Sequence, residues 1–309
     1  KALVYLSRAA RKAPARWANW EAVVLFDRAL DALEHLPKVE RTLEHGIDLR
    51  IALEHALLLV GEPARALEHL LEAERVAEAL DDQWRLGWAS NYLSEYFGTV
   101  GEHARALALG QRALEIGIAL GDVTLQAESR LRLGQLCHAR GDYREAADLL
   151  GMNLVTPTGS TPIRKDESLL ATISSQRAKT GLLSVLSRVW LVWCLAELGE
   201  FATGLSDGQV RLADSSSPRD PFQPMLAYLA AGRHHLRKGN IEQALEFLEK
   251  CREIQRLGNF DLWSASISSS LGYAYLLGGR LDDAAALLTE AVEQANATKS
   301  MLGHSLRLA

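Results

Sequence analysis

The chain has 309 residues, of which 48% are hydrophobic and 24% are charged, and its formal net charge is −5. It has no long run of Lys and Arg, so it lacks the basic footprint that nucleic-acid binding requires. No apolar stretch reaches the roughly 18 residues of a membrane span and no signal peptide is recognisable, so neither nucleic acid nor membrane is expected as a partner.

A phrase that opens with glycine recurs along the chain and predicts a helical repeat. Its copies begin at Gly61, Gly101, Gly141, Gly199, Gly239 and Gly279. The spacings are 40, 40, 58, 40 and 40 residues, and chance does not give four equal spacings with the same flanking pattern. We place each glycine in the turn between two antiparallel helices, where a left-handed backbone costs glycine least.

Small residues recur five positions after these glycines, and mostly leucines recur eight positions before them. The small residues are Ala66, Ala106, Ala146, Gly204, Ala244 and Ala284, and the upstream residues are Leu53, Leu93, Leu133, Leu191, Ala231 and Leu271. Small side chains let the two helices of a hairpin approach closely, whereas leucines fill the layer between hairpins. The pattern predicts an all-α chain: an α-solenoid, wound as a right-handed superhelix, of about six helical hairpins with a period of about 40 residues.

In chain order, the first three hairpins are expected within residues 1–155. Ala22 and Phe26 belong to an earlier, weaker copy of the phrase, in which residues 1–13 form the first helix and Trp17 takes the place of the glycine. Aspartates that lie 18 or 19 residues before a glycine are expected to cap the first helix of a hairpin. These aspartates are Asp82, Asp122, Asp220 and Asp261.

One insertion explains the longer spacing. Residues 156–168 (TPTGSTPIRKDES) are rich in Pro, Gly, Ser and Thr, so they are expected to form a loop. This loop could cover a groove as a lid, although a tolerated surface loop is the simpler interpretation. Hairpins four to six are expected in residues 169–297, and residues 298–309 would begin a truncated seventh hairpin.

The repeated phrase resembles the tetratricopeptide repeat, whose signature is W-x2-L-G-x2-Y followed by A-x3-F. Leu271-Gly272-x2-Tyr275 and Ala22-x3-Phe26 match parts of that signature. Longer phrases, among them LSRVWLVWCLAELGEF and LGYAYLLGGRLDDA, resemble the C-terminal region of large bacterial signalling proteins. In those proteins a class III adenylate/guanylate cyclase domain and an AAA-type ATPase module precede a repeat array. The resemblance implies a regulatory or ligand-sensing segment, without cyclase or ATPase activity in this chain.

The sequence offers no recognisable catalytic or metal-binding motif. It contains no P-loop, G-x-S-x-G, H-E-x-x-H, G-x-G-x-x-G or EF-hand pattern. Cys137, Cys194 and Cys251 lie far apart, which favours reduced thiols and a cytoplasmic location. The adjacent His234 and His235 would point about 100° apart on a helix, so they are expected to pack rather than share a metal. We therefore expect no enzyme, no catalytic residues, no cofactor and no metal.

The first helix of each stacked hairpin is expected to line the concave surface of the array. Positions about 13, 10, 6, 3 and 2 residues before each glycine then face a groove. The candidate groove-binding residues are Trp88, Asn91, Glu95, Gln135, His138, Trp193, Arg233 and Tyr273. Polar side chains have little reason to be buried, so Asn91, Glu95 and Arg233 are expected to be exposed. Trp88 and Trp193 could instead pack in the core.

Aromatics, amides, acids and arginines on one face suit a peptide or an extended protein segment. We expect a non-catalytic scaffold that binds a protein or peptide segment, with other domains of a parent protein among the partners. The alternative is a sensor for a small-molecule or peptide effector, which would need an enclosed pocket lined by three or more hairpins. A scaffold would instead show an open trough or an exposed apolar patch. Self-association through a helix face is also expected.

Overall fold

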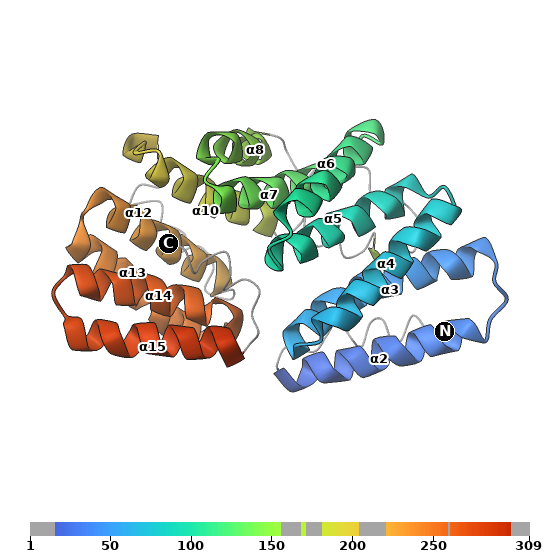
Figure 1. Ribbon diagram of the computed structural model, residues 1–309, viewed down its shortest axis with the longest axis horizontal. Coiled ribbons are helices and arrows are strands. Elements are labelled where there is room, and N and C mark those ends of the chain that lie inside the picture. The colour runs from blue at the N-terminus through green and yellow to red at the C-terminus, as the bar shows by residue number, and fades with distance from the viewer. Residues whose placement is uncertain (1–15, 156–167, 171–180, 204–220, 259, 298–309) are drawn as a thin grey trace. The chain divides into compact units, whose positions relative to one another are not determined.

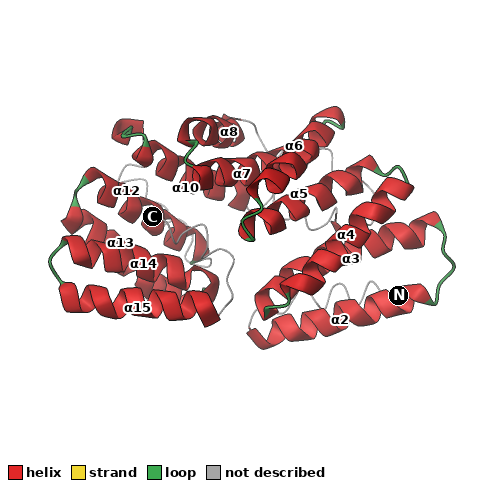
Figure 2. Cartoon of the chain, in the orientation of Figure 1, coloured by secondary structure: helices red, strands yellow, loops and turns green. Residues whose placement is uncertain are grey.

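The structure is a computed structural model, and it describes residues 16–155, 168–170, 181–203, 221–258 and 260–297. These residues form twelve α-helices and one short 3-10 helix, and no strand occurs among them (Figures 1 and 2). The predicted all-α fold of sequential hairpins is confirmed. The chain divides into two compact units, residues 1–132 with 158–180 and residues 133–157 with 181–309, which we call the first and the second unit.

The helices follow one another in the order that the repeat predicts (Figure 1). The first unit contains α2 (Arg16–Glu34), α3 (Glu40–Val60), α4 (Pro63–Ala79), α5 (Gln83–Thr99) and α6 (His103–Ala119). The boundary between the units falls within α7 (Val123–Arg140). The second unit continues with α8 (Tyr143–Val155), α10 (Leu182–Glu197), η1 (Phe201–Thr203), α12 (Phe222–Lys238), α13 (Ile241–Gly258), α14 (Asp261–Leu277) and α15 (Leu281–Ala297).

Each predicted turn glycine has a left-handed backbone, with φ between 75° and 86° at all six positions. The turn after α3 shows the geometry. The Gly61 N–H donates to the Leu58 carbonyl at 3.2 Å, and the Glu62 N–H donates to the Leu57 carbonyl at 2.9 Å. This Schellman arrangement satisfies carbonyls that a helix end would otherwise leave open. The same two bonds recur at the other five glycines, so a single turn chemistry sets the repeat.

The small residues five positions after the turn glycines are buried between paired helices, as the sequence predicts. Glycines inside the first helices allow further close contacts. Ala66, Ala106, Ala146 and Ala244 are fully buried between paired helices. A side chain at Gly232 of α12 would place its Cβ 2.5 Å from Leu248 Cγ of α13. Gly134 and Gly272 meet leucines of their own second helices in the same way. Close pairing of the two helices of a hairpin therefore depends on the small residue of the second helix and on the glycine of the first helix.

Two of the four predicted caps are confirmed. The Asp82 carboxylate accepts a hydrogen bond from the Arg85 N–H, and Asp122 accepts from the Thr124 and Leu125 N–H groups at 2.9 and 3.0 Å. The prediction for Asp261 is wrong, because Phe260 occupies the N-cap position of α14 and Asp261 is the first helical residue. Asp220 lies outside the described residues.

Hairpins stack on their neighbours in chain order within each unit. In the first unit, α3 contacts both α2 and α4, and α5 contacts both α4 and α6. In the second unit, α10 packs on α8 and α12, and α13 packs on α12 and α14. Three predicted regions lie outside the described residues: the first helix in residues 1–13, most of the inserted loop, and residues 298–309. Leu169, just after that loop, packs against the core of α2, α3 and α4.

Candidate functional site

The candidate residues of the first unit pack against other side chains of the same unit. Trp88 and Asn91 of α5 are each 1% exposed, and Trp88 meets Trp84 and Tyr92 in ring contacts of 6.4 and 6.3 Å. The expected exposure of Asn91 is therefore wrong. Glu95 of α5 is partly exposed and pairs with Arg132 of α7 at 2.6 Å. These three residues belong to the packing between α5 and its neighbours.

A buried ion pair fixes the start of α5 on the preceding hairpin. Arg85 of α5 donates to Asp48 of α3 at 2.8 Å and to the cap residue Asp82 at 2.6 Å. Burial disfavours the guanidinium charge, but the two carboxylates outweigh burial and raise the pKa of Arg85 above its usual value. Carboxylates of α3 and of the helix's own cap therefore compensate the charge of this first-unit arginine.

In the second unit, four of the predicted residues lie on successive first helices and form a chain of contacts. His138, at the end of α7, meets Trp190 of α10 with ring centroids 5.2 Å apart. Trp190 meets Trp193 at 4.7 Å. The guanidinium of Arg233, from α12, lies 4.1 Å from the ring centroid of Trp193. Arg233 and Tyr273 of α14 then line one recess. Gln135 of α7 is partly buried on the same helix as His138.

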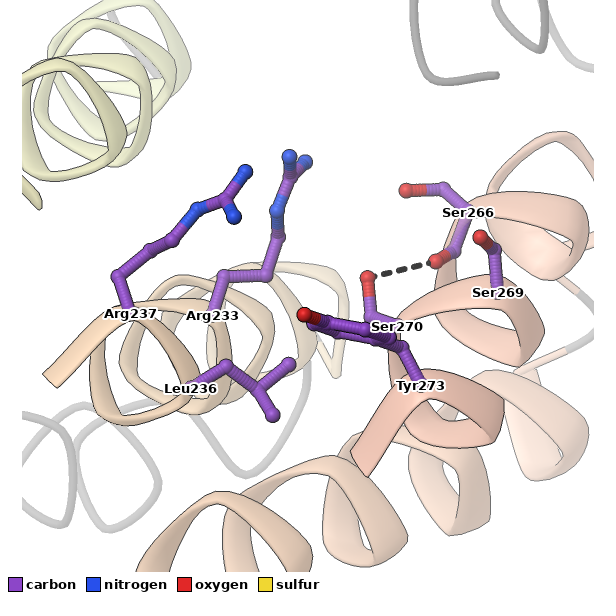
Figure 3. Close-up of a pocket in the computed structure, with 7 residues that line it drawn as sticks. All are labelled: Arg233, Leu236, Arg237, Ser266, Ser269, Ser270 and Tyr273. Carbon is purple, nitrogen blue, oxygen red and sulfur yellow. Dashed lines mark hydrogen bonds between the residues drawn. The ribbon is translucent and has the colours of Figure 1, made fainter. Parts of the chain in front are cut away.

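The recess lies between α12 and α14, and apolar atoms make up most of its surface although most of its lining residues are polar (Figure 3). Its lining residues are Arg233, Leu236, Arg237, Ser266, Ser269, Ser270 and Tyr273. Figure 3 shows the two guanidinium groups of α12 side by side, facing the serines of α14. Its cavity volume is about 40 Å³, whereas sites that enclose a whole small molecule measure about 300–1,000 Å³. The recess can hold one polar group of a ligand, not an entire ligand.

The two arginines of the recess differ in their partners. Arg237 donates to Glu197 of α10 at 2.6 Å, so its charge is compensated. Arg233 is 9% exposed, and among the described residues its buried Nη1 atom has no hydrogen-bond partner. The expected exposure of Arg233 is therefore wrong. Burial, with a smaller contribution from the Arg237 charge, lowers the pKa of Arg233 to about 10, which leaves the group charged at neutral pH.

Further polar atoms of this chain of contacts, and one of the recess, are buried without hydrogen-bond partners in the described part of the chain. They are the indole Nε1 atoms of Trp190 and Trp193, the Ser266 Oγ and the His138 Nε2. Burial, with smaller contributions from Arg233 and Arg237, lowers the pKa of His138 to about 4, so its imidazole is neutral at pH 7. Indole N–H and guanidinium groups can only donate hydrogen bonds. The cluster is therefore rich in donors and poor in acceptors.

Sequence reasoning selected Trp193 but missed Trp190, and it missed Ser266 and Ser270. A signal was present, because Trp190 and Ser266 precede Trp193 and Ser269 by three residues and so share a helix face with them. The predicted packing roles of His234, His235 and the three cysteines are confirmed. His235 stacks on Phe247 at 5.4 Å, and Cys137, Cys194 and Cys251 are buried free thiols. Burial raises the pKa of Cys137 to about 11 and that of Cys194 to about 12.

Within the described ranges, no group of three or more His, Cys, Asp or Glu side chains could hold a metal ion. Across the same part of the chain, no helix combines the length and the apolar character that crossing a bilayer requires.

Sequence comparison finds repeats in two stretches of the chain. Residues 224–297 and residues 127–151 each match a sequence model described as a tetratricopeptide repeat. No curated protein matches the chain by sequence.

Solved structures share the fold at low identity. The crystal structure of a Rap protein complexed with competence and sporulation factor aligns with a TM-score of 0.65 and 12% identity, and the alignment covers 97% of this chain and 76% of that one. The crystal structure of the apo form of RapI also gives a TM-score of 0.65 and 12% identity, over 96% of this chain and 98% of that one. Residues 127–151 and 224–297 therefore match tetratricopeptide repeats, and the likeness to the two Rap structures shows the same fold of stacked helical hairpins over nearly the whole chain.

Proposed function

We propose that the chain is a non-catalytic tetratricopeptide repeat scaffold that binds a peptide or a protein segment through the first helices of its second unit. The observation that carries this proposal is the contact chain from His138 through Trp193 to Arg233 and Tyr273. Trp193 is 2% exposed and supports Arg233 from within the core, whereas Tyr273 is 40% exposed and can contact an extended ligand directly. The non-catalytic assignment rests on the sequence, which contains no P-loop, G-x-S-x-G, H-E-x-x-H or G-x-G-x-x-G pattern.

The shape of the recess favours a scaffold over a sensor that encloses a small molecule. A sensor would need a deep pocket lined by three or more hairpins, but α12 and α14 alone line this recess, and its volume is about 40 Å³. A peptide could insert one group there and lie along the rest of the face. The Rap protein of similar fold, complexed with competence and sporulation factor, supports ligand capture as a use of this architecture.

The larger context of the chain is also part of the proposal. The phrases LSRVWLVWCLAELGEF and LGYAYLLGGRLDDA support a regulatory segment of a bacterial signalling protein with cyclase and ATPase modules. In such a protein, the bound segment would be a partner or one of the parent's own modules. Co-purification of this chain with a cyclase or ATPase domain, expressed separately, tests that extension independently of the binding face.

The direct test is capture of peptides from a randomised display library by the immobilised chain. Tyr273 is 40% exposed, so Tyr273→Ala removes an aromatic group from the face with little effect on the core. The matched control is Trp20→Ala, which removes a 46% exposed aromatic from α2 in the first unit. We expect Tyr273→Ala to lose most of the captured peptides and Trp20→Ala to keep them. Equal capture by both variants would discard this face.

A further inference from the structure

We propose that ion pairs between neighbouring hairpins specify the order in which the hairpins stack. Each hairpin thereby accepts its own neighbour and rejects a hairpin that belongs to the other unit, whether of the same chain or of a second copy. The inference goes beyond the proposed function, because it concerns the surfaces through which the hairpins recognise one another. The sign and the position of carboxylate–arginine pairs between helices carry it.

The apolar contacts between hairpins are too alike to fix this order. The small residue after the turn glycine is alanine in most hairpins, and Ala66, Ala106 and Ala244 are fully buried. The residue eight positions before the glycine is mostly leucine, and Leu53 and Leu93 are fully buried. Similar apolar surfaces gain similar free energy from burial against a wrong neighbour and against the right one. Exchange of elements between copies is a characteristic failure of repeat proteins, so a further feature must distinguish the hairpins.

In the first unit, the second helices α4 and α6 are joined by ion pairs whose carboxylates lie on the earlier helix. Arg112 of α6 pairs with Glu74 of α4 at 3.1 Å and with Glu78 of α4 at 2.7 Å. The two glutamates lie 13 and 17 positions after the turn glycine of their hairpin, and Arg112 lies 11 positions after the turn glycine of the next hairpin. The earlier second helix is therefore acidic at this contact and the later one is basic.

In the second unit, the same repeat positions carry the opposite signs. Arg252 and Arg256 of α13 lie 13 and 17 positions after their turn glycine, and Glu290 of α15 lies 11 positions after its own. Arg252 donates to Glu290 at 2.6 Å. The arginine of the pair therefore lies on the earlier second helix in the second unit and on the later second helix in the first unit.

A hairpin that stacked in the wrong unit would bring like charges together. If α6 stacked on α13, Arg112 would meet Arg252 and Arg256, and if α15 stacked on α4, three carboxylates would gather. Exposed ion pairs add little stability, whereas like charges in one interface suppress a wrong partner strongly. Charges beside the apolar seam of coiled coils select partners in the same way. The reversal of sign therefore separates the hairpins of the two units.

The first helices add a second distinction, which depends on position and not on sign. Three arginines pair with a carboxylate of the preceding first helix: Arg85 with Asp48 at 2.8 Å, Arg132 with Glu95 at 2.6 Å, and Arg237 with Glu197 at 2.6 Å. These arginines lie 16, 9 and 2 positions before their turn glycines, so successive pairs are displaced by seven residues, or about two helical turns. An exchanged first helix would present its arginine at a different height from the carboxylate of its new neighbour.

The competing explanation is that the pairs only stabilise the helices that carry them. A variant with Glu74→Arg, Glu78→Arg and Arg112→Glu separates the two explanations, because it keeps the attraction between α4 and α6 but gives the first unit the signs of the second. Pairs that only stabilise would act equally well in either orientation. Pairs that specify order would fail in this variant, because α6 could then stack on α13 and α15 on α4 with opposite charges in contact.

The experiment compares refolding of the wild-type chain, of Arg112→Glu alone, of the triple variant and of a control. The control combines Lys250→Glu with Glu253→Lys, which reverses a 2.9 Å ion pair inside α13 and leaves the contacts between hairpins unchanged. Each protein is unfolded in urea and refolded at several protein concentrations. Analytical ultracentrifugation then measures the ratio of dimer to monomer, with protein that was never unfolded as the reference. Circular dichroism measures the melting temperature of each monomer.

We expect Arg112→Glu to lower the melting temperature, because it places three carboxylates together, and the triple variant to recover it. We also expect the triple variant to refold with a dimer-to-monomer ratio about tenfold or more above that of wild type and of the control. A triple variant that recovers its melting temperature and refolds like wild type would overturn the inference, because the pairs would then stabilise without ordering. A melting temperature that is not recovered, or an equal rise of dimer in the control, would overturn it as well.

Discussion

His138 and Arg233 show how single residues of the second unit share one electrostatic environment. His138 contacts the rings of Tyr143 and Trp190, and the positive charges of Arg233 and Arg237 disfavour its protonated form. Burial is the largest cause of its lowered pKa, and the two arginines add to it. Between about pH 4 and pH 6.5 the folded chain therefore keeps the imidazole of His138 neutral, whereas the imidazole of the unfolded chain is protonated.

The pH dependence of stability follows from this shift. The pKa of His138 falls from 6.5 unfolded to about 4 folded, so its contribution to stability is complete above pH 6.5 and is lost as the pH falls toward 4. The loss is at most about 3 kcal/mol. We expect His138→Gln to show a smaller decrease in unfolding free energy than wild type between pH 7 and pH 5, measured by urea denaturation. Parallel decreases in both proteins would show that His138 titrates normally.

At the scale of helices, the pairing of α12 with α13 depends on the absence of a side chain at Gly232. In Gly232→Ala the new Cβ would meet Leu248 Cγ at 2.5 Å, inside a buried contact. We expect a loss of about 1–3 kcal/mol from overpacking, although alanine favours a helix by about 1 kcal/mol.

The matched control is Gly151→Ala in α8, where the added Cβ has no neighbour within 4 Å. Here only the helix propensity acts, so we expect a neutral result or a gain of up to about 1 kcal/mol. Urea denaturation of the two variants beside wild type measures both effects. A shift of the same sign and size in both would mean that close approach of helices does not limit the hairpin.

The turns could be predicted from sequence because a position with a left-handed backbone is usually occupied by glycine. All six repeat glycines are in that conformation, and the small slots after them are buried wherever they are described. Asp82 and Asp122 could likewise be predicted as helix N-caps. Asp261 was not, because the spacing of an aspartate from its glycine places a helix start only to within one residue, and Phe260 takes the cap position.

The candidate site was predicted less well, because exposure on a first helix depends on the next hairpin. Sequence places Asn91 and Arg233 on the correct helices, but neighbouring helices bury both. A polar side chain was expected to avoid burial, and that rule fails here because it treats each helix as isolated. Trp193 and Arg233 occupy equivalent positions of neighbouring repeats, 40 residues apart, so the period predicts that they lie near each other but not that the guanidinium stacks on the ring.

At the scale of the whole molecule, stacking in chain order makes stability local. Within the second unit, α12 contacts α10, α13 and α14, and each hairpin of such an array draws its stability from its neighbours. We expect Gly232→Ala to speed amide hydrogen exchange in α12 to α15 while exchange in α3 to α6 stays at wild-type rates, as measured by mass spectrometry. Uniform acceleration along the chain would instead indicate one cooperative globule.

The central claim is that the first helices of the second unit hold a peptide or a protein segment. A crystal structure of the chain with the tightest peptide captured from the display library measures this directly. We predict that the peptide lies along α10, α12 and α14 and contacts the exposed side chain of Tyr273. A peptide bound to the first unit, or to the second helices alone, would contradict the account.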